Sequence, residues 1–133
     1  MQITYKINTP ITAEQVSELF IKSGINRPSD DLPRIRKMLD NSNLIITAWS
    51  EEKIVGIARS LTDFCYCCYL SDLAVDIEFQ KSGIGKELIN RTREAITDQS
   101  MLLLLSAPLA MDYYPKVDFE RTDKAFIINR KGI

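Results

Sequence analysis

The sequence predicts a single α/β (α+β) domain over residues 1–133 with one mixed sheet, and three observations lead to this prediction. The chain has 133 residues, the length of one domain, and 45% of them are hydrophobic, which is enough for one core. Segments with the two-residue period of strands alternate with segments that have the 3.6-residue period of helices. In the second half, an apolar strand, a helix and a further apolar strand follow one another as in a parallel βαβ crossover. The expected element order is β-α-α-β-β-β-α-β-α-β-β.

The first half of the chain is expected to form a strand, two helices and two antiparallel strands. Alternating apolar residues at Ile3, Tyr5 and Ile7 indicate the first strand. Thr12 begins a capping-box pattern at the start of the first helix, and Gly24 suits the position after its end. The other elements expected here are a short helix after Asp30 and Asp31 and strands over Leu44–Trp49 and Lys53–Leu61.

The second half is expected to contain the crossover and a C-terminal pair of strands. A strand over Cys65–Val75 leads through a polar connection into a helix whose apolar residues keep helical spacing from Ile84 to Ile96. The continuous apolar run Met101–Leu105 suits a strand that is buried on both faces. The elements expected after it are a short helix around Met111–Lys116 and strands near Glu120–Thr122 and Ala125–Asn129.

Composition and charge exclude several classes of partner and site. The net charge of −1 gives no indication of binding to nucleic acid or to an anionic membrane. No apolar run approaches the roughly 20 residues of a membrane span, and the first residues lack the apolar core of a secretory signal. We therefore expect a soluble, cytoplasmic protein with no nucleic-acid or membrane partner.

The cysteines do not form the pattern of a metal site. Cys65, Cys67 and Cys68 lie in one strand-like stretch, and the sequence contains no His. A zinc site would need a fourth ligand, and neighbouring strand residues point to opposite faces. We expect no metal and reduced thiols packed as small hydrophobic groups. The absence of His also excludes the Ser-His and Cys-His nucleophilic systems.

The connection before the central helix has the composition of an anion-binding loop. The first N–H groups of a helix lack intrahelical partners, and the helix dipole places partial positive charge there. Gly83 and Gly85 allow a ligand to approach the backbone closely, and Lys81 and Lys86 add positive charge. The loop therefore predicts a phosphate or pyrophosphate site, while an ordinary glycine-containing helix start stays open as the alternative.

The hexapeptide Gln80-Lys81-Ser82-Gly83-Ile84-Gly85 resembles the acetyl-CoA-binding motif Gln/Arg-x-x-Gly-x-Gly/Ala of the GCN5-related N-acetyltransferase superfamily. The element order resembles the fold of that superfamily over nearly the whole chain. The resemblance implies a strongly twisted mixed sheet with helices on both faces. It also implies that this loop and the helix N-terminus hold the pyrophosphate of coenzyme A.

A second signature of the superfamily, aromatic-Tyr-x-Lys-x-Gly-Phe, resembles residues 113–119, with Asp118 in place of the glycine. Asp is among the few residues that tolerate a left-handed turn, so the fold should survive this departure. The resemblance implies that Tyr114 donates a proton to the coenzyme A thiolate. The alternative is that Tyr113 and Tyr114 only pack the short helix, which we favour for Tyr113 alone. The cofactor-binding residues that the resemblance implies are Leu73, Ala74, Val75, Gln80, Lys81, Ser82, Gly83, Ile84, Gly85, Lys86, Ser106 and Tyr114.

The reaction implied by the resemblance is direct attack of a primary amine on acetyl-CoA, the acyl donor, in a ternary complex. The backbone N–H groups of Leu73 and Val75 are expected to face the thioester and the pantetheine arm. Asp72 is the expected general base, which would require a pKa raised by burial, and proton loss through water stays open as the alternative. The acceptor, a small-molecule or peptide amine, stays open, as does a homodimer. A non-catalytic acyl-CoA-binding sensor or partner domain is the alternative function.

Overall fold

The computed structural model describes residues 2–132, and its five strands form one mixed sheet in the order β1-β2-β3-β4-β5. The strands are β1 (Thr4–Ile7), β2 (Leu44–Ser50), β3 (Lys53–Thr62), β4 (Cys67–Val75) and β5 (Met101–Leu103). The helices are α1 (Ala13–Ser23), α2 (Leu32–Asp40) and α3 (Ile84–Ile96), with short 3-10 turns η1 (Ile77–Phe79), η2 (Pro108–Ala110) and η3 (Tyr114–Val117). All neighbouring strands are antiparallel except β4 and β5, which are parallel and joined through α3. The predicted βαβ crossover and mixed sheet are therefore confirmed.

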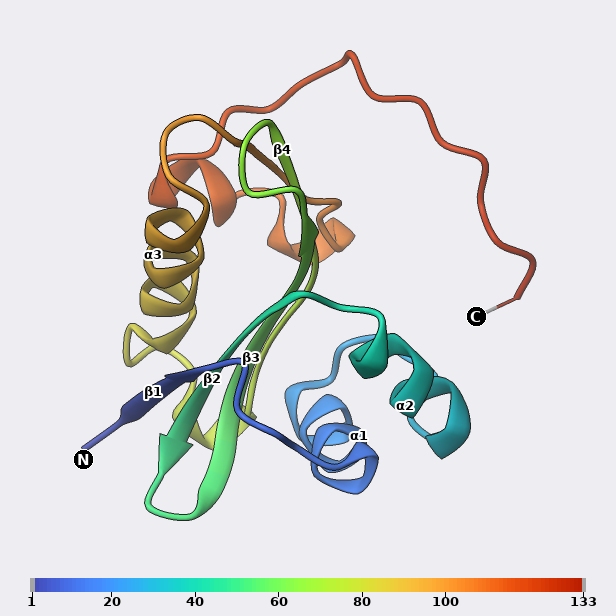
Figure 1. Ribbon diagram of the computed structural model, residues 1–133, viewed down its shortest axis with the longest axis vertical. Coiled ribbons are helices and arrows are strands. Elements are labelled where there is room, and N and C mark those ends of the chain that lie inside the picture. The colour runs from blue at the N-terminus through green and yellow to red at the C-terminus, as the bar shows by residue number, and fades with distance from the viewer. Residues whose placement is uncertain (1, 133) are drawn as a thin grey trace.

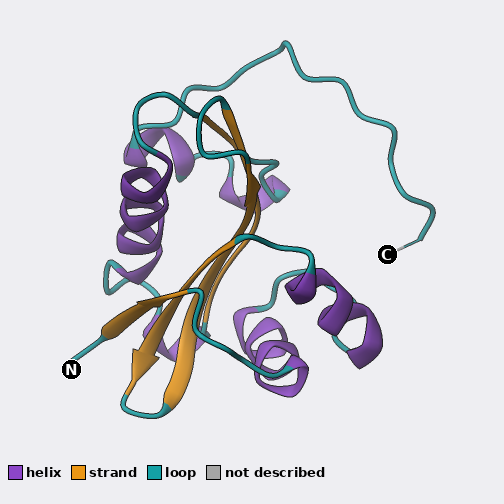
Figure 2. Ribbon diagram, in the orientation of Figure 1, coloured by secondary structure: helices purple, strands orange, loops and turns teal. Residues whose placement is uncertain are grey.

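Helices cover both faces of this sheet (Figures 1 and 2). On one face, α1 and α2 enclose a core that includes Phe20 and Ile57. On the other face, α3 packs over a second core that includes Leu70 and Leu88. We call these the α1/α2-side core and the α3-side core. The sheet thus forms the middle of three layers, as the predicted fold class requires.

The local signals around α1 form as the sequence predicts. The Gln15 backbone N–H donates to the Thr12 hydroxyl at 3.0 Å, and the Thr12 N–H donates to the Gln15 side-chain oxygen at 2.9 Å. These reciprocal bonds satisfy two of the free donors at the helix start. Gly24 ends the helix with φ of 80°, the left-handed conformation that glycine adopts without strain.

Helix α3 lies close to the sheet because of one glycine in β3. A Cβ added to Gly56 would stand only 3.1 Å from side-chain atoms of both Ile84 and Leu88. Contacts this short are tighter than most real side-chain contacts, so a larger residue here would push α3 outwards by a few tenths of an ångström. This packing fixes the N-terminal end of α3 against the sheet, where the candidate site is built.

Strand β4 contains one extra residue relative to its partner β3. Arg59 pairs with Asp72, but the next residue, Ser60, pairs with Leu70. Ser71 is therefore the extra residue of a β-bulge, which bends its strand and increases the local twist.

The bulge changes which side chains of β4 face each core. Before it, Leu70 belongs to the α3-side core. After it, Ala74 belongs to the α1/α2-side core, whereas Leu73 and Val75 pack towards α3. The two-residue alternation of a regular strand would have placed Leu70 and Ala74 on the same face.

The C-terminal end differs from the sequence prediction. In the described chain neither Glu120–Thr122 nor Ala125–Asn129 forms a strand, so the expected last pair of strands is wrong. The two residues between them, Asp123 and Lys124, lie outside the positive-φ region that a two-residue hairpin requires. The chain after residue 120 instead leaves the body as an extended trace (Figure 1).

The strand and helix before this tail are also shorter than expected. Strand β5 ends at Leu103 rather than Leu105, and it is not buried on both faces, since Met101 is 57% exposed and Leu105 is 53% exposed. Its far side has no neighbouring strand among the described residues. The helix expected around Met111–Lys116 does not form: the 3-10 turn η2 ends before this stretch, and η3 begins within it.

The cysteines correct another expectation. Of the three, Cys68 is buried, whereas Cys65, in the turn before β4, and Cys67, the first residue of β4, are exposed. The Asp63 carboxylate organises this turn by accepting the backbone N–H groups of Cys65, Cys67 and Tyr66, which hold its pKa well below the usual range. Strand β4 therefore begins at Cys67 instead of Cys65.

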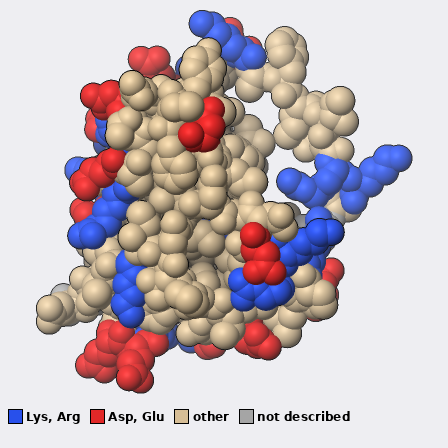
Figure 3. All heavy atoms as spheres, in the orientation of Figure 1, with Lys and Arg blue, Asp and Glu red and all other residues tan. Residues whose placement is uncertain are grey.

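Charged side chains of both signs are mixed around the outline of the face seen in Figure 3, with a broad uncharged area between them. No single-sign field dominates this view. Within residues 2–132 no helix has the length and apolar character needed to cross a bilayer. The same residues contain no group of three His, Cys, Asp or Glu side chains placed to hold a metal ion.

Candidate active site

Strand β4 is paired along only part of its length. Its pairing with β5 covers Cys67, Cys68 and Tyr69 and then stops, because β5 ends at Leu103. From Leu70 to Val75, β4 has no strand on this side among the described residues, and we call this side its inner edge. The predicted contact residues Leu73, Ala74 and Val75 all lie on this half of the strand. A strand edge that lacks a partner offers backbone N–H and C=O groups to a ligand.

The N-terminus of α3 lies at the end of this edge. Gly83 is the N-cap residue, with φ of 85° and ψ of 4°, and no side chain caps the helix. The first intrahelical hydrogen bond runs from the Glu87 N–H to the Gly83 carbonyl at 3.0 Å. The N–H groups before it point out of the helix start, where the dipole adds partial positive charge. This is the geometry of an anion site, as the glycine pattern predicts.

The loop before α3 is held in place by its own polar side chains. The Gln80 side-chain amide donates to the Val75 carbonyl at 2.9 Å, and the Ser82 hydroxyl donates to the Phe79 carbonyl. The resemblance implied that both side chains bind the cofactor, but here they form hydrogen bonds that stabilise the loop. Lys81 and Lys86 are exposed, and Lys81 adopts a positive φ of 67°.

Ile84 has a different role from its neighbours in the motif. Its side chain is only 2% exposed and packs in the α3-side core. It can therefore offer only backbone groups to a ligand, and its side chain fixes the helix start to the sheet.

Tyr113 is a residue of this site that sequence reasoning assigned to packing alone. A Cβ on Gly85 would lie 3.2 Å from the Tyr113 hydroxyl oxygen and 3.9 Å from a Val75 methyl group. Gly85 therefore leaves room for a phenol directly against the first turn of α3. Burial raises the pKa of Tyr113, so this hydroxyl is a neutral donor at the anion site. The motif has only glycine or alanine at this point, and that restriction to small residues was the available signal.

Tyr114 is packed between two aromatic rings. Its ring meets Tyr113 and Phe119 edge to face, with centroids 5.3 Å and 5.5 Å away. The pKa of Tyr114 is raised by burial and by the neighbouring Tyr113, and it is lowered by the positive charge of Arg27. The phenol therefore keeps its proton at neutral pH.

Asp118 adopts the left-handed turn that its position in the second signature predicts. Its φ is 75°, and its N–H donates to the Tyr114 carbonyl at the end of η3. The prediction that Asp can replace glycine at this turn is confirmed. The turn fixes the direction in which the chain leaves Tyr114.

Asp72 is enclosed by two arginines. It is 0% exposed, and its two oxygens accept hydrogen bonds from Arg27 Nε and Arg59 Nε. Arg27 also donates to the Ser71 carbonyl at 2.7 Å, and Arg59 donates to the Ser71 hydroxyl at 3.0 Å. Each oxygen of Asp72 is thus held by a charge-assisted bond to an arginine. This geometry suits a brace for the bulge better than the general base expected from the sequence.

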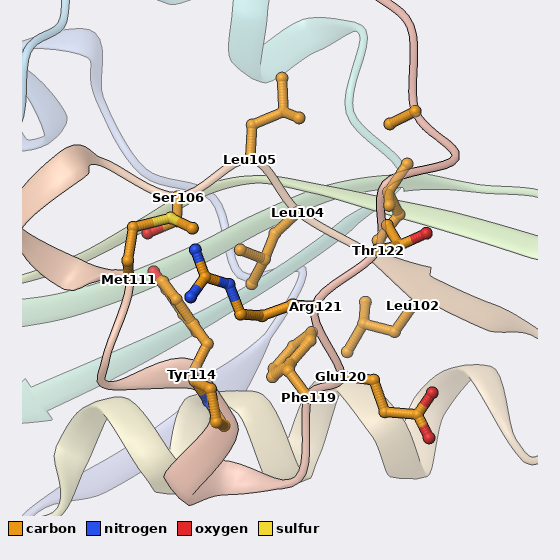
Figure 4. A pocket seen from close by; sticks show the side chains of 13 residues that line it. Leu102, Leu104, Leu105, Ser106, Met111, Tyr114, Phe119, Glu120, Arg121 and Thr122 are labelled. Atoms are coloured by element: carbon orange, nitrogen blue, oxygen red, sulfur yellow. The ribbon is translucent and has the colours of Figure 1, made fainter.

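Ser106 lies in a hollow on the far side of β5. Its hydroxyl donates to the neighbouring Ala107 carbonyl at 2.7 Å. This local bond uses the hydroxyl proton that would otherwise be offered to a cofactor. The hollow has a volume of about 350 Å³. Figure 4 shows Arg121 reaching across it towards Met111 and the hydroxyl end of Tyr114. This hollow follows β5 and is separate from the inner edge of β4.

The elements of the site come together from four parts of the chain. Val75 ends β4, Gly85 begins α3, and Tyr113 precedes η3, and these three residues are neighbours in space. The Arg27 charge reaches Tyr114 from the loop after α1. The predicted loop and strand residues are thus gathered at one end of the sheet, with Tyr114 beside them.

Comparisons with known proteins agree with this geometry. The family model described as "Acetyltransferase (GNAT) domain" matches residues 9–133. The chain belongs to the GNAT acetyltransferase family.

Individual relatives are distant. GCN5-related N-acetyltransferase 2, chloroplastic, of Arabidopsis thaliana is 29% identical over 53% of this chain, and the match covers 28% of that protein. The next two relatives, both uncharacterized N-acetyltransferases, are matched over 48% and 56% of their lengths. The chain thus spans only part of the curated relatives it matches.

Solved structures show the same GNAT fold. The probable acetyltransferase SA2161 from meticillin-resistant Staphylococcus aureus has a TM-score of 0.84 at 20% identity, covering 98% of this chain and 100% of that one. AAC(6')-Iy, solved with the bisubstrate analog CoA-S-monomethyl-acetylneamine, has a TM-score of 0.72 at 14% identity, covering 99% and 100%. At these identities the likeness establishes the fold alone.

Proposed function

We propose that this acetyltransferase moves the acetyl group of acetyl-CoA to the primary amine of a small molecule, by direct attack in a ternary complex in the cytoplasm. The observation that carries the proposal is the uncapped N-terminus of α3 beside the unpaired inner edge of β4. Together they offer donors for a phosphate group and backbone groups for an extended amide-bearing chain. The existence of a solved structure of this fold with an analog containing CoA supports the choice of donor.

The residues that would hold acetyl-CoA fall into two groups. The N–H groups at the start of α3, with Lys81 and Lys86, suit the pyrophosphate. The backbone groups of Leu73 and Val75 suit the pantetheine arm. The Gln80 side-chain amide, which donates to the Val75 carbonyl, would either rotate away or share that carbonyl with the pantetheine arm. Acetyl-CoA supplies a thioester carbonyl that an amine nitrogen can attack.

Tyr114 would act as the general acid. Its proton stays on the phenol at neutral pH, so it can be passed to a departing thiolate when the carbon–sulfur bond breaks. The amine loses one proton as the new carbon–nitrogen bond forms, and water accepts it. Tyr114 then regains a proton from solvent, which completes the balance.

Asp72 takes a structural role in this proposal. Its two arginine partners hold the bulge at Ser71, and the bulge bends β4 where its pairing with β5 stops. Asp72 therefore keeps the inner edge open, and the proton of the amine leaves through water.

A panel of small amines and short peptides, incubated with acetyl-CoA, would test the proposal. Mass spectrometry should detect an acceptor that carries one added acetyl group, and the panel should cover a wide chemical range of amines. Mass detection is needed because the exposed thiols Cys65 and Cys67 would react with a thiol dye. Binding of acetyl-CoA, read as a shift in melting temperature, is the second measurement. A protein that neither binds acetyl-CoA nor acetylates any amine class would overturn the proposal.

A further inference from the structure

Two arginines and one aspartate form a cluster at the bulge of β4 that carries an excess of positive charge. Arg27 and Arg59 each form an ion pair with the same carboxylate, Asp72. Within residues 2–132 neither arginine pairs with a second carboxylate. Two positive charges and one negative charge therefore give this cluster a net charge of +1.

The groups around the cluster do not balance this charge. Besides Asp72, the acceptors of its N–H groups are carbonyl and hydroxyl oxygens, which carry only partial charge. The acidic residues of the loop after α1, Asp30 and Asp31, are exposed, and in the described chain neither of them pairs with Arg27. A charge that is largely removed from water is costly unless it has a partner. The cluster therefore favours a further, negatively charged group.

Arg27 is the member of the cluster that a ligand can reach. Its side chain is 26% exposed, whereas that of Arg59 is 8% exposed. Three of its five N–H groups are donated to Asp72 and to the carbonyls of Asn26 and Ser71. The other two, one on each terminal nitrogen, have no acceptor in the part of the chain that the structure describes. Two N–H groups of one guanidinium suit the two oxygens of a carboxylate.

Arg27 also lies beside the proposed reaction centre. It belongs to the loop between α1 and α2 on one face of the sheet, whereas Tyr114 packs with the α3-side core (Figure 1). Burial raises the pKa of Tyr114 and the Arg27 charge lowers it, so the two side chains interact although they come from opposite faces. Arg27 is bound to Ser71 and Asp72, in the half of β4 whose inner edge is unpaired. A group held by Arg27 would therefore lie on the α1/α2 side of this edge.

We propose that the acceptor is an amino acid or a close analogue, a small molecule whose primary amine is acetylated and whose carboxylate is bound by Arg27. This inference rests on the proposed acetyl transfer and names the class of acceptor that the site selects. The carboxylate brings the cluster to a net charge of zero, and the guanidinium holds the molecule with its amine beside the thioester. A cationic amine without an acid group meets the same positive charge and is disfavoured.

Free amino acids and their carboxamides, compared as matched pairs, test this proposal. Each member of a pair is incubated with acetyl-CoA and the full chain, and its kcat/KM is measured by mass spectrometry. The acid should exceed the amide by about 10–100-fold, the range expected for hydrogen bonds to a charged group. Reactivity alone predicts the opposite order, because the amine beside an amide group is the weaker base and more of it is neutral at pH 7.

Two substitutions of Arg27 separate recognition from packing. Arg27→Gln should lower kcat/KM for the acid by about 10–100-fold and bring it close to that of the amide. A purely structural role would lower both substrates alike and keep their ratio. Arg27→Lys retains the charge without the planar pair of donors, so it should retain part of the ratio. The matched control is Arg36→Gln, which changes an exposed arginine paired with Asp40 and should keep the wild-type ratio.

The possible outcomes distinguish this inference from the proposed function. An amide used as well as its acid by the wild type, or an unchanged ratio in folded Arg27→Gln, would overturn the inference. Acetylation of neither member of any pair would also overturn it, and proposed acetyl transfer would stand if other amines were acetylated. Absence of acetyl-CoA binding, read as no shift in Tm, would overturn both. If circular dichroism shows that Arg27→Gln is unfolded, the wild-type pairs and Arg27→Lys decide.

Discussion

Among the described residues, the inner edge of β4 and the outer edge of β5 both lack a neighbouring strand, and they lie on opposite sides of β5. The inner edge of β4 ends at a helix N-terminus with exposed lysines and polar loop side chains. The outer edge of β5 is bordered by leucines and aromatic rings. The unpaired backbone is chemically the same at both, so the neighbouring side chains and helix dipole must decide what each edge binds. The first offers donors to an anionic ligand, whereas the second is bordered mainly by apolar side chains.

The comparison is sharpest at Tyr114, which stands between the two edges. Its side chain lines the hollow beside β5, and its hydroxyl is the proposed general acid for the thioester. Tyr114→Phe removes only the hydroxyl, so turnover should fall by about 10²–10⁴-fold while acetyl-CoA affinity and oligomeric state stay unchanged. Steady-state kinetics with an identified acceptor would measure this, with Tyr66→Phe as the control because Tyr66 is 77% exposed. Unchanged turnover, with chemistry rate-limiting, would leave Tyr114 a packing residue.

The pH dependence of turnover in the wild type and in Tyr114→Phe gives a second test of the general-acid role. Its pKa lies above the ordinary value of about 10, because burial favours the neutral phenol. The acid form is therefore present throughout neutral pH, and activity should decline only as pH rises past that value. Tyr114→Phe should remove this alkaline decline from the pH profile of kcat, and persistence of the decline in the variant would point to another group.

The brace behind the inner edge should matter greatly for stability. Asp72→Asn leaves Arg59, whose side chain is 8% exposed, without its negative partner. Loss of one member of a buried ion pair typically costs about 3–5 kcal/mol in the free energy of unfolding. Urea unfolding would measure this, with Asp40→Asn as the control, because its pair with Arg36 is exposed and should contribute no more than about 0.5 kcal/mol. A stable Asp72→Asn protein that loses turnover would instead restore the general-base hypothesis.

The anion site at the inner edge can be tested with two matched glycines. Gly83 and Gly24 both have φ near 80° and no atom within 4 Å of an added Cβ, so valine strains the backbone similarly at each. At a hundredfold excess over Kd, acetyl-CoA should stabilise the wild type and Gly24→Val by about 2.7 kcal/mol, seen as a rise in Tm. Gly83→Val should lose this rise, because the side chain projects from the helix start. An equal rise in both variants would move the phosphate site elsewhere.

The cysteines should have the smallest effect on either edge. Cys65 and Cys67 are exposed, so Cys65→Ser and Cys67→Ala should each change stability by no more than about 0.5 kcal/mol. Cys68→Ala should cost more, because this side chain is buried in the α3-side core. Turnover of the triple variant, corrected for the folded fraction, should match the wild type. Complete loss of turnover in the folded triple variant would indicate a thiol step.

Local chemistry explains which parts of the molecule the sequence could predict. The capping box at Thr12, the left-handed turn at Asp118 and the uncapped start of α3 each depend on a few adjacent residues. The fold class followed from strand and helix periods and from the resemblance to a known family. These features depend on residues close together in the chain, so a single sequence contains their signal.

The parts that were missed or wrong depend on distant contacts. Arg27 reaches Asp72 from 45 positions earlier in the sequence, and no local pattern announces that ion pair. The contact between Tyr113 and Gly85 likewise joins two separate motifs. The segment 125–129 has the pattern of a strand, but a strand also needs a neighbour, and the pattern does not say which edge supplies it.

The bend in β4 depends on one inserted residue. Deleting Ser71 would restore one-to-one pairing between β3 and β4 while leaving Leu70 and Leu73 on the α3 side and Ala74 on the other. Both cores would survive, but the bend and the arginine contacts to Ser71 would be lost. A single codon therefore separates a bent β4 from a regular strand of the same fold. The shape of the sheet beside the proposed site can change by such a short mutational path, with no rebuilding of the core.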